Sequence, residues 1–267
     1  MIRAGHLLLL GTGGSMGVPL IGCNCPVCTS TSPYNKRLRP SALCVVGKQQ
    51  YLIDCGPDFR QQALTYQIDH LDGVFFTHSH NDHTAGLDDL KVYTARSKQP
   101  MECLLSRETY AKLKRRFYYI FEEDSLYTGL TPSFNMHFLE EDRGEYTFGE
   151  LRIRYFTYEQ LGMRVNGFRF GDLAYVSDIR AFPETIFDDL TGLKTLVLSA
   201  LRFSSSQMHF NVDEAIDFAK RTGAERTWLM HVAHDLDHEK ANAYLPQNIR
   251  MAYDGLKINF ETESINA

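Results

Sequence analysis

The chain lacks the features of a membrane or secreted protein. No apolar run in its 267 residues approaches the roughly 20 residues that a membrane-spanning helix needs. Cysteine is scarce, and of the six cysteines three (Cys44, Cys55 and Cys103) lie singly in apolar segments, where buried free thiols are usual. We therefore expect a soluble, unsecreted protein in the reducing cytoplasm, with no membrane partner.

An excess of positive charge is also missing. The net charge is -5, so the molecule as a whole has no field that attracts polyanions. The basic run from Lys112 to Arg116 is typical of the solvated face of a helix. This charge balance argues against a large nucleic acid as partner and favours a small-molecule substrate.

Internal repeats and low-complexity linkers are absent, and 43% hydrophobic content suffices for a large core. We expect one domain over residues 1–267. Short apolar strands alternate with helical segments, which favours a layered α/β fold.

The segment from Ile120 to Phe134 is irregular, and the alternatives for it are a lid, a homodimer contact or an ordinary surface loop. Predicted strands cover residues 6–10, 42–46, 51–54, 73–77, 101–105, 151–156, 168–176, 193–199, 227–230 and 257–260, with helices over 59–66 and 212–221.

Histidines concentrate directly after one predicted strand. The segment Thr77 to His83 holds three imidazoles and one carboxylate in a His-x-His-x-Asp-His pattern. If the strand continued, His78 and His80 would project to the same side, with Asp82 and His83 in the turn before a helix. Mixed nitrogen and oxygen ligands suit zinc, manganese or iron(II) at a catalytic centre rather than a closed structural site.

A second cluster is formed by Cys23, Cys25 and Cys28 in a C-x-C-x-x-C loop. Three thiols this close are awkward as disulfides but convenient as thiolate ligands of zinc. His231 or His234, far downstream, is a candidate fourth ligand. A redox-sensing thiol loop is the alternative interpretation.

Polar residues follow several predicted strands where each ends. Asp54, His78, Asp178 and His231 all have this position, so they can converge on one rim of a sheet. The glycine-rich segment from Gly11 to Gly17 lacks the lysine of a phosphate-binding loop, and we interpret it as a tight turn close to the site.

Together these motifs resemble the metallo-β-lactamase-fold hydrolases. Within them, the chain is similar to the branch that contains the phosphoribosyl cyclic phosphodiesterase of phosphonate breakdown. The resemblance extends over nearly the whole chain and rests mainly on the histidine segment and the cysteine loop. It implies a four-layer αββα sandwich of two mixed sheets.

The resemblance also implies metal-binding and catalytic roles. It assigns His78 and His80 to one Zn²⁺ or Mn²⁺ ion, and Asp82, His83 and His231 to a second, with Asp178 between the two. It further assigns a catalytic role to Asp82 and His209. A structural Zn²⁺ would be held by Cys23, Cys25, Cys28 and His234.

One position departs from the family pattern. The family has a further histidine ligand of the first ion shortly before a Gly-Phe-Arg segment, and here the matching position is Gln160. No histidine lies between His137 and His209. Gln160 or Glu159 would have to supply an oxygen instead, which predicts a first ion that is weakly bound, different or absent.

The expected activity is hydrolysis of a small cyclic or nucleotide-like phosphodiester by metal-activated water, with His209 protonating the leaving group. Arg39 and Arg60 are candidates for binding a phosphate, or for structural ion pairs. Three alternatives remain open: a thioester or lactone hydrolase on the same fold, a nuclease resembling the tRNA 3′-end endonucleases, and a binding protein whose catalysis is lost at Gln160.

Overall fold

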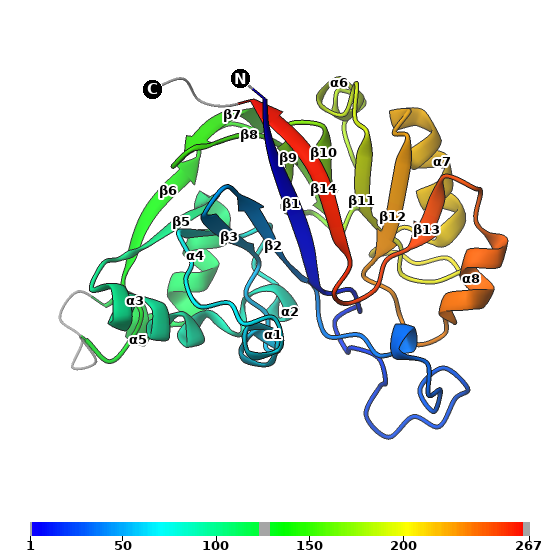
Figure 1. Ribbon diagram of the computed structural model, residues 1–267, viewed down its shortest axis with the longest axis horizontal. Coiled ribbons are helices and arrows are strands. Elements are labelled where there is room, and N and C mark those ends of the chain that lie inside the picture. Colours follow the sequence, from blue (N-terminus) through cyan, green and yellow to red (C-terminus); the bar gives the residue numbers. More distant parts are fainter. Residues whose placement is uncertain (1, 123–128, 264–267) are drawn as a thin grey trace.

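The computed structural model describes residues 2–122 and 129–263, and the centre of the irregular segment predicted between Ile120 and Phe134 lies outside these ranges. Two seven-stranded sheets face each other, as Figure 1 shows. The first has the order β14-β1-β2-β3-β4-β5-β6, with strands β1 (Ile2–Gly11), β2 (Ser41–Val46), β3 (Gln49–Ile53), β4 (Gly73–Phe75), β5 (Met101–Ser106), β6 (Phe134–Leu139) and β14 (Lys257–Glu263).

The second sheet has the order β13-β12-β11-β10-β9-β8-β7. Both sheets are mixed, because each has an antiparallel half and a parallel half. The strands of the second sheet are β7 (Arg143–Phe148), β8 (Leu151–Gln160), β9 (Met163–Phe170), β10 (Leu173–Val176), β11 (Thr195–Ser199), β12 (Arg226–Met230) and β13 (Ile249–Met251).

Helices cover the outer face of each sheet. The first sheet carries α1 (Phe59–Thr65), α3 (Lys91–Ser97), α4 (Arg107–Arg116) and α5 (Tyr118–Phe121), and the second carries α6 (Ile186–Asp189), α7 (Val212–Thr222) and α8 (His238–Tyr244). Short elements complete the chain: η1 (Pro33–Asn35), α2 (Asn81–Thr84) and η2 (Leu87–Leu90).

Three apolar cores lie between these layers. One lies between the sheets, with Leu9 and Phe75 from the first sheet and Phe168 and Tyr175 from the second. The other two lie between each sheet and its helices. The predicted αββα sandwich of two mixed sheets is therefore confirmed. The core between the sheets fixes the strand ends that carry the polar residues.

Side-chain capping explains where two of the helices begin. Asn211 and Glu214 form a reciprocal capping box at the start of α7. The N-cap of α4 is Ser106, whose side chain accepts a hydrogen bond from the Thr109 backbone. Among the described residues, no helix is both long enough and apolar enough to cross a bilayer.

Candidate metal centre

Strand ends bring the predicted polar residues to one place. Asp54 follows β3, Asp178 follows β10 by two residues and His231 follows β12. All three have left-handed backbone, with φ of 60°, 55° and 59°. Residues other than glycine rarely adopt this backbone conformation, and those that do tend to lie at functional sites.

Four buried side chains form the first group of donor atoms: Asp82, His83, Asp178 and His231. One donor atom from each lies within 4.8 Å of all the others. His231 Nε2 is 3.0 Å from Asp178 Oδ1 and 3.3 Å from Asp82 Oδ2. His83 Nε2 is 3.3 Å from Asp178 Oδ2 and 3.4 Å from Asp82 Oδ2. Two carboxylates and two imidazoles thus enclose one small volume, which we call the four-donor group.

His78, His80 and Asp178 form a second group, the three-donor group. His78 Nε2 lies 3.3 Å from Asp178 Oδ2 and 3.1 Å from His80 Nδ1. Strand β4 ends at Phe75, so a shared strand face does not align these histidines; His80 is the N-cap of α2. Asp178 belongs to both groups, and the six residues predicted for the centre converge.

Opposite charges dominate the electrostatics of this site. Burial raises the pKa of Asp178, but the facing His231 and His83 outweigh burial and hold that pKa well below its usual range. Burial lowers the pKa of His83, but Asp178 and Asp82 outweigh it and raise that pKa well above the ordinary value. The carboxylates are therefore ionised and require nearby positive charge, which protonated histidines or a divalent cation can supply.

Asp54 sets the orientation of two of these histidines. Its carboxylate accepts hydrogen bonds from the Thr77 backbone (2.8 Å), from Thr77 Oγ1 (2.7 Å) and from His83 Nδ1 (2.6 Å). Because the Thr77 hydroxyl donates to Asp54, its lone pair accepts from His78 Nδ1 at 2.8 Å. Both rings therefore donate from Nδ1 and turn Nε2 toward Asp178, so a cation that replaced any proton on Nε2 would meet them in the tautomer of metal-ligating histidines.

The donor set fits divalent cations. The Nε2 atom of His83 is buried and has no hydrogen-bond partner in the described part of the chain, although it faces two carboxylates. Imidazole nitrogen and carboxylate oxygen together suit zinc, manganese or iron(II). The four-donor group can enclose one ion and the three-donor group a second, with Asp178 between them.

Replacing Asp54 with asparagine tests the orienting role. In Asp54→Asn the amide cannot accept from both Thr77 and His83, so the two imidazoles lose their fixed tautomers. We expect metal affinity at the centre to fall by about 10- to 100-fold, measured by competition with a chelating dye. The exposed Asp69, which pairs with His70, gives the control Asp69→Asn. Equal affinity in the two variants would contradict the role of Asp54.

Gln160 and His209 complete the polar lining. Gln160 is the last residue of β8 and is 2% exposed. Its Nε2 lies 3.0 Å from His209 Nε2, 3.2 Å from His209 Nδ1 and 3.5 Å from Asp178 Oδ2. The His209 ring stacks on His231 with centroids 4.8 Å apart. Burial, then His231, lowers the pKa of His209 to about 4, so its ring is neutral at pH 7.

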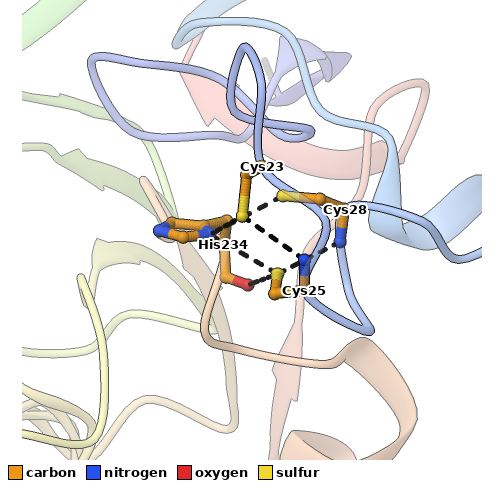
Figure 2. A group of neighbouring side chains, drawn as sticks. All are labelled: Cys23, Cys25, Cys28 and His234. Carbon is orange, nitrogen blue, oxygen red and sulfur yellow. Dashed lines mark hydrogen bonds between the residues drawn. The ribbon is translucent and has the colours of Figure 1, made fainter.

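The cysteine loop forms a separate cluster (Figure 2). The Sγ atoms of Cys23, Cys25 and Cys28 lie 3.4 Å, 3.5 Å and 3.6 Å from His234 Nδ1. Three sulfurs around one imidazole nitrogen give the Cys₃His donor set of a structural zinc site. Of the two candidate histidines, His234 joins the thiols and His231 joins the centre.

Contacts explain the positions of Arg39, a candidate for binding a phosphate, and of two further histidines. Arg39 pairs with Asp58 at 2.8 Å, and His137 contacts Glu102 and Tyr146 in another part of the fold. His238 begins α8 and accepts from buried Arg37 at 3.0 Å. Gly14 donates to the Val232 carbonyl, which places the glycine-rich turn beside His231.

Sequence reasoning missed the roles of Thr77 and of a network around Arg37 and Asp254. Asp254 accepts from the Thr12 backbone and hydroxyl and from the Leu38 backbone, and Arg37 donates to Thr12 at 2.7 Å. This network ties the segment that follows the cysteines to the end of β1 and to the turn between β13 and β14. No pattern in the sequence indicated it, because the burial of Arg37 is apparent only in the fold.

Comparisons with known proteins identify the fold family. A model of the β-lactamase superfamily domain matches residues 49–232. A crystal structure described as a new diphosphatase from the PhnP family is 35% identical, covers 98% of this chain and 99% of its own, and superimposes with a TM-score of 0.91. The Zn²⁺-bound PqqB of Methylobacterium extorquens is 18% identical, with a TM-score of 0.74 over 95% of this chain and 99% of its own, and shows the fold alone.

A protein of Porphyromonas gingivalis named octanoyltransferase is 31% identical over 97% of this chain. The chain spans only 52% of that protein's length. The family match extends over more than half of the chain, and the fold and the histidine motif agree with it. The chain therefore belongs to the β-lactamase superfamily and has the metallo-β-lactamase fold.

Proposed function

We propose that this protein is a phosphodiesterase-like hydrolase of small cyclic or nucleotide-like phosphate esters. The observation that carries the proposal is Asp178, whose carboxylate contacts both donor groups: Oδ2 faces His78 and His83, and Oδ1 faces His231. Two ions held on either side of one carboxylate match the pair of metals that many phosphate-cleaving enzymes use. The diphosphatase described for the similar structure supports chemistry at phosphorus.

The ligands would be divided between two ions. His78, His80 and Asp178 would hold one, and Asp82, His83, Asp178 and His231 the other. When bound, divalent ions lower the pKa of water and offset charge on phosphoryl oxygens.

The chain's own residues then fix the geometry around the substrate. Asp54 and Thr77 keep two imidazoles in the ligand tautomer. His209, neutral at pH 7, has both ring nitrogens near the Gln160 amide nitrogen, and its ring N–H would be the donor to a substrate oxygen.

Charge favours a small substrate. The net charge is -5, and Arg39, a cation from the turn before β2, is held by the Asp58 carboxylate. Arg116 of the basic helix α4 donates to Thr84 at the end of α2, so it supports the histidine segment. A long polyanion would find little free positive charge on these residues.

Comparing substrate classes tests the proposal. For each substrate, the rate enhancement is the catalysed rate divided by the uncatalysed rate. We expect the enhancement by the zinc- or manganese-loaded protein to be at least about 100-fold larger for bis(p-nitrophenyl) phosphate or a cyclic nucleotide than for a p-nitrophenyl acyl ester. Such a ratio corresponds to about 2.7 kcal/mol of selective transition-state stabilisation. Activity that favours the acyl ester would overturn the proposal.

An acyl ester or thioester hydrolase is the second candidate function. Leu161 directly follows Gln160 and Met208 directly precedes His209, and both apolar side chains are exposed beside the contact between Gln160 and His209. Such a border suits an apolar chain. The octanoyl group in the name of the P. gingivalis relative points the same way. Hydrolysis of octanoyl thioesters, with no phosphodiester cleavage, would favour this candidate.

A further inference from the structure

The two donor groups are unequal. The four-donor group has four buried side chains and two carboxylates, whereas the three-donor group has three side chains, one of which, His80, is only partly buried. Zinc and manganese sites usually have four or more ligands. The three-donor group therefore needs a further donor from a neighbouring residue, from water or from substrate.

Gln160 lies beside the three-donor group. Its amide nitrogen is 3.5 Å from Asp178 Oδ2, and the same oxygen is 3.3 Å from His78 Nε2. Because an ionised carboxylate only accepts hydrogen bonds, the amide group that faces it must be the NH₂. The NH₂ also reaches His209, so both contacts agree on the orientation of the amide.

This orientation leaves the carbonyl oxygen of Gln160 without a partner. Oε1 is buried and accepts no hydrogen bond from any described residue. A buried unpaired carbonyl oxygen costs about 1–3 kcal/mol. Gln160 thus borders a group that lacks a ligand and has a buried oxygen without a partner, and a bound cation would satisfy both.

We propose that Gln160 is a positioning residue that joins the three-donor group to His209. Its carbonyl oxygen supplies the fourth donor for an ion held by His78, His80 and Asp178. Its NH₂ lies near both ring nitrogens of His209 and is closer to Nε2, at 3.0 Å, than to Nδ1, at 3.2 Å. When it donates to Nε2, that nitrogen is unprotonated and the proton of the neutral ring lies on Nδ1. Glutamine can perform both tasks at once, because its oxygen and its nitrogen point in different directions.

The consequence is a centre with two different affinities. Ions fill the four-donor group first, and the group completed by a neutral amide binds its ion more weakly. Filling the second position also fixes Gln160, and with it the nitrogen of His209 that can donate to substrate. This inference extends the proposed function, but its test needs no substrate.

Two variants separate the two tasks of Gln160. Gln160→Met keeps the length of the side chain and removes both the oxygen and the NH₂. Gln160→Glu keeps an oxygen donor but replaces the NH₂ with an acceptor. Zinc titration by calorimetry measures each binding step, and long-range ¹⁵N–¹H NMR of the zinc-loaded protein reports which nitrogen of His209 is protonated.

We expect the wild type to show a weaker second step at the centre and a single His209 tautomer. Gln160→Met should weaken that step by at least about tenfold and give a mixture of tautomers. Gln160→Glu should retain the step and reverse the tautomer, because its carboxylate accepts a hydrogen bond from the ring N–H that faces it. Wild-type affinity and an unchanged tautomer in both variants would overturn the proposal.

Gln62 provides a matched control. It is also fully buried, its Nε2 donates to the Arg39 carbonyl at 2.9 Å and its Oε1 likewise lacks a described partner. Gln62→Met should lower stability without changing either readout. If zinc binding and the His209 tautomers follow these expectations but the wild type hydrolyses no phosphodiester, the proposed function is rejected and the role of Gln160 stands.

Discussion

Replacing Asp178 with asparagine will abolish most of the activity, by about a thousandfold or more. The variant keeps the size of the side chain but removes the negative charge that faces His78, His83 and His231. Both donor groups lose their shared ligand, and the loss of about 4 kcal/mol of electrostatic stabilisation corresponds to a factor of roughly 10³ in rate. Phosphodiester hydrolysis and ion counts on the same preparation measure the effect.

Asp188→Asn is the control for this substitution. Asp188 is an exposed residue of α6 that pairs with Arg143 at 3.7 Å. Neither residue of this pair belongs to a donor group. It should keep full activity and the wild-type number of ions. If Asp178→Asn kept both as well, Asp178 would not be a shared ligand.

Replacing Cys25 with serine will remove one zinc ion per chain and lower the melting temperature without removing ions from the centre. The three thiols surround His234, and a hydroxyl is a poor substitute for a thiolate ligand (Figure 2). At free zinc 100-fold above the dissociation constant, lost binding costs about 2.7 kcal/mol. That loss corresponds to a decrease in melting temperature of roughly 5–10 °C in a chain of this size.

Thr31→Ala is the matched control, because Thr31 is an exposed residue of the same loop. It should change neither the zinc content nor the melting temperature. The redox interpretation of the loop predicts a different outcome for Cys25→Ser: unchanged zinc content and the loss of a reversible oxidation. That result would contradict a structural zinc site at the cysteine loop.

Strand positions were largely predictable because buried strands leave continuous apolar runs. The expected strand over residues 168–176 is instead two strands, β9 and β10, separated by a turn at Gly171 and Asp172. Strands β6 and β7 were missed, since polar and aromatic residues alternate in them on a half-exposed face. Their pairing with β5 and β8 overrides this weak local preference.

The candidate site was more predictable than its connections. The histidine segment and the strand-end residues could be recognised in the sequence by their residue types and by their positions after apolar runs. The roles of Asp54 and Thr77 in orienting rings depend on contacts between β3 and the residues after β4, which no spacing in the sequence encodes. The contact between Gln160 and His209 joins residues 49 positions apart, so it also required the fold.

Metal content per chain tests the central claim most directly. Elemental analysis would be made after purification without chelators and equilibration with zinc, for the wild type, Asp178→Asn and Cys25→Ser. The account predicts three ions in the wild type, one fewer in Cys25→Ser and at least one fewer in Asp178→Asn. One ion or none in the wild type, or the same count in all three proteins, would contradict it.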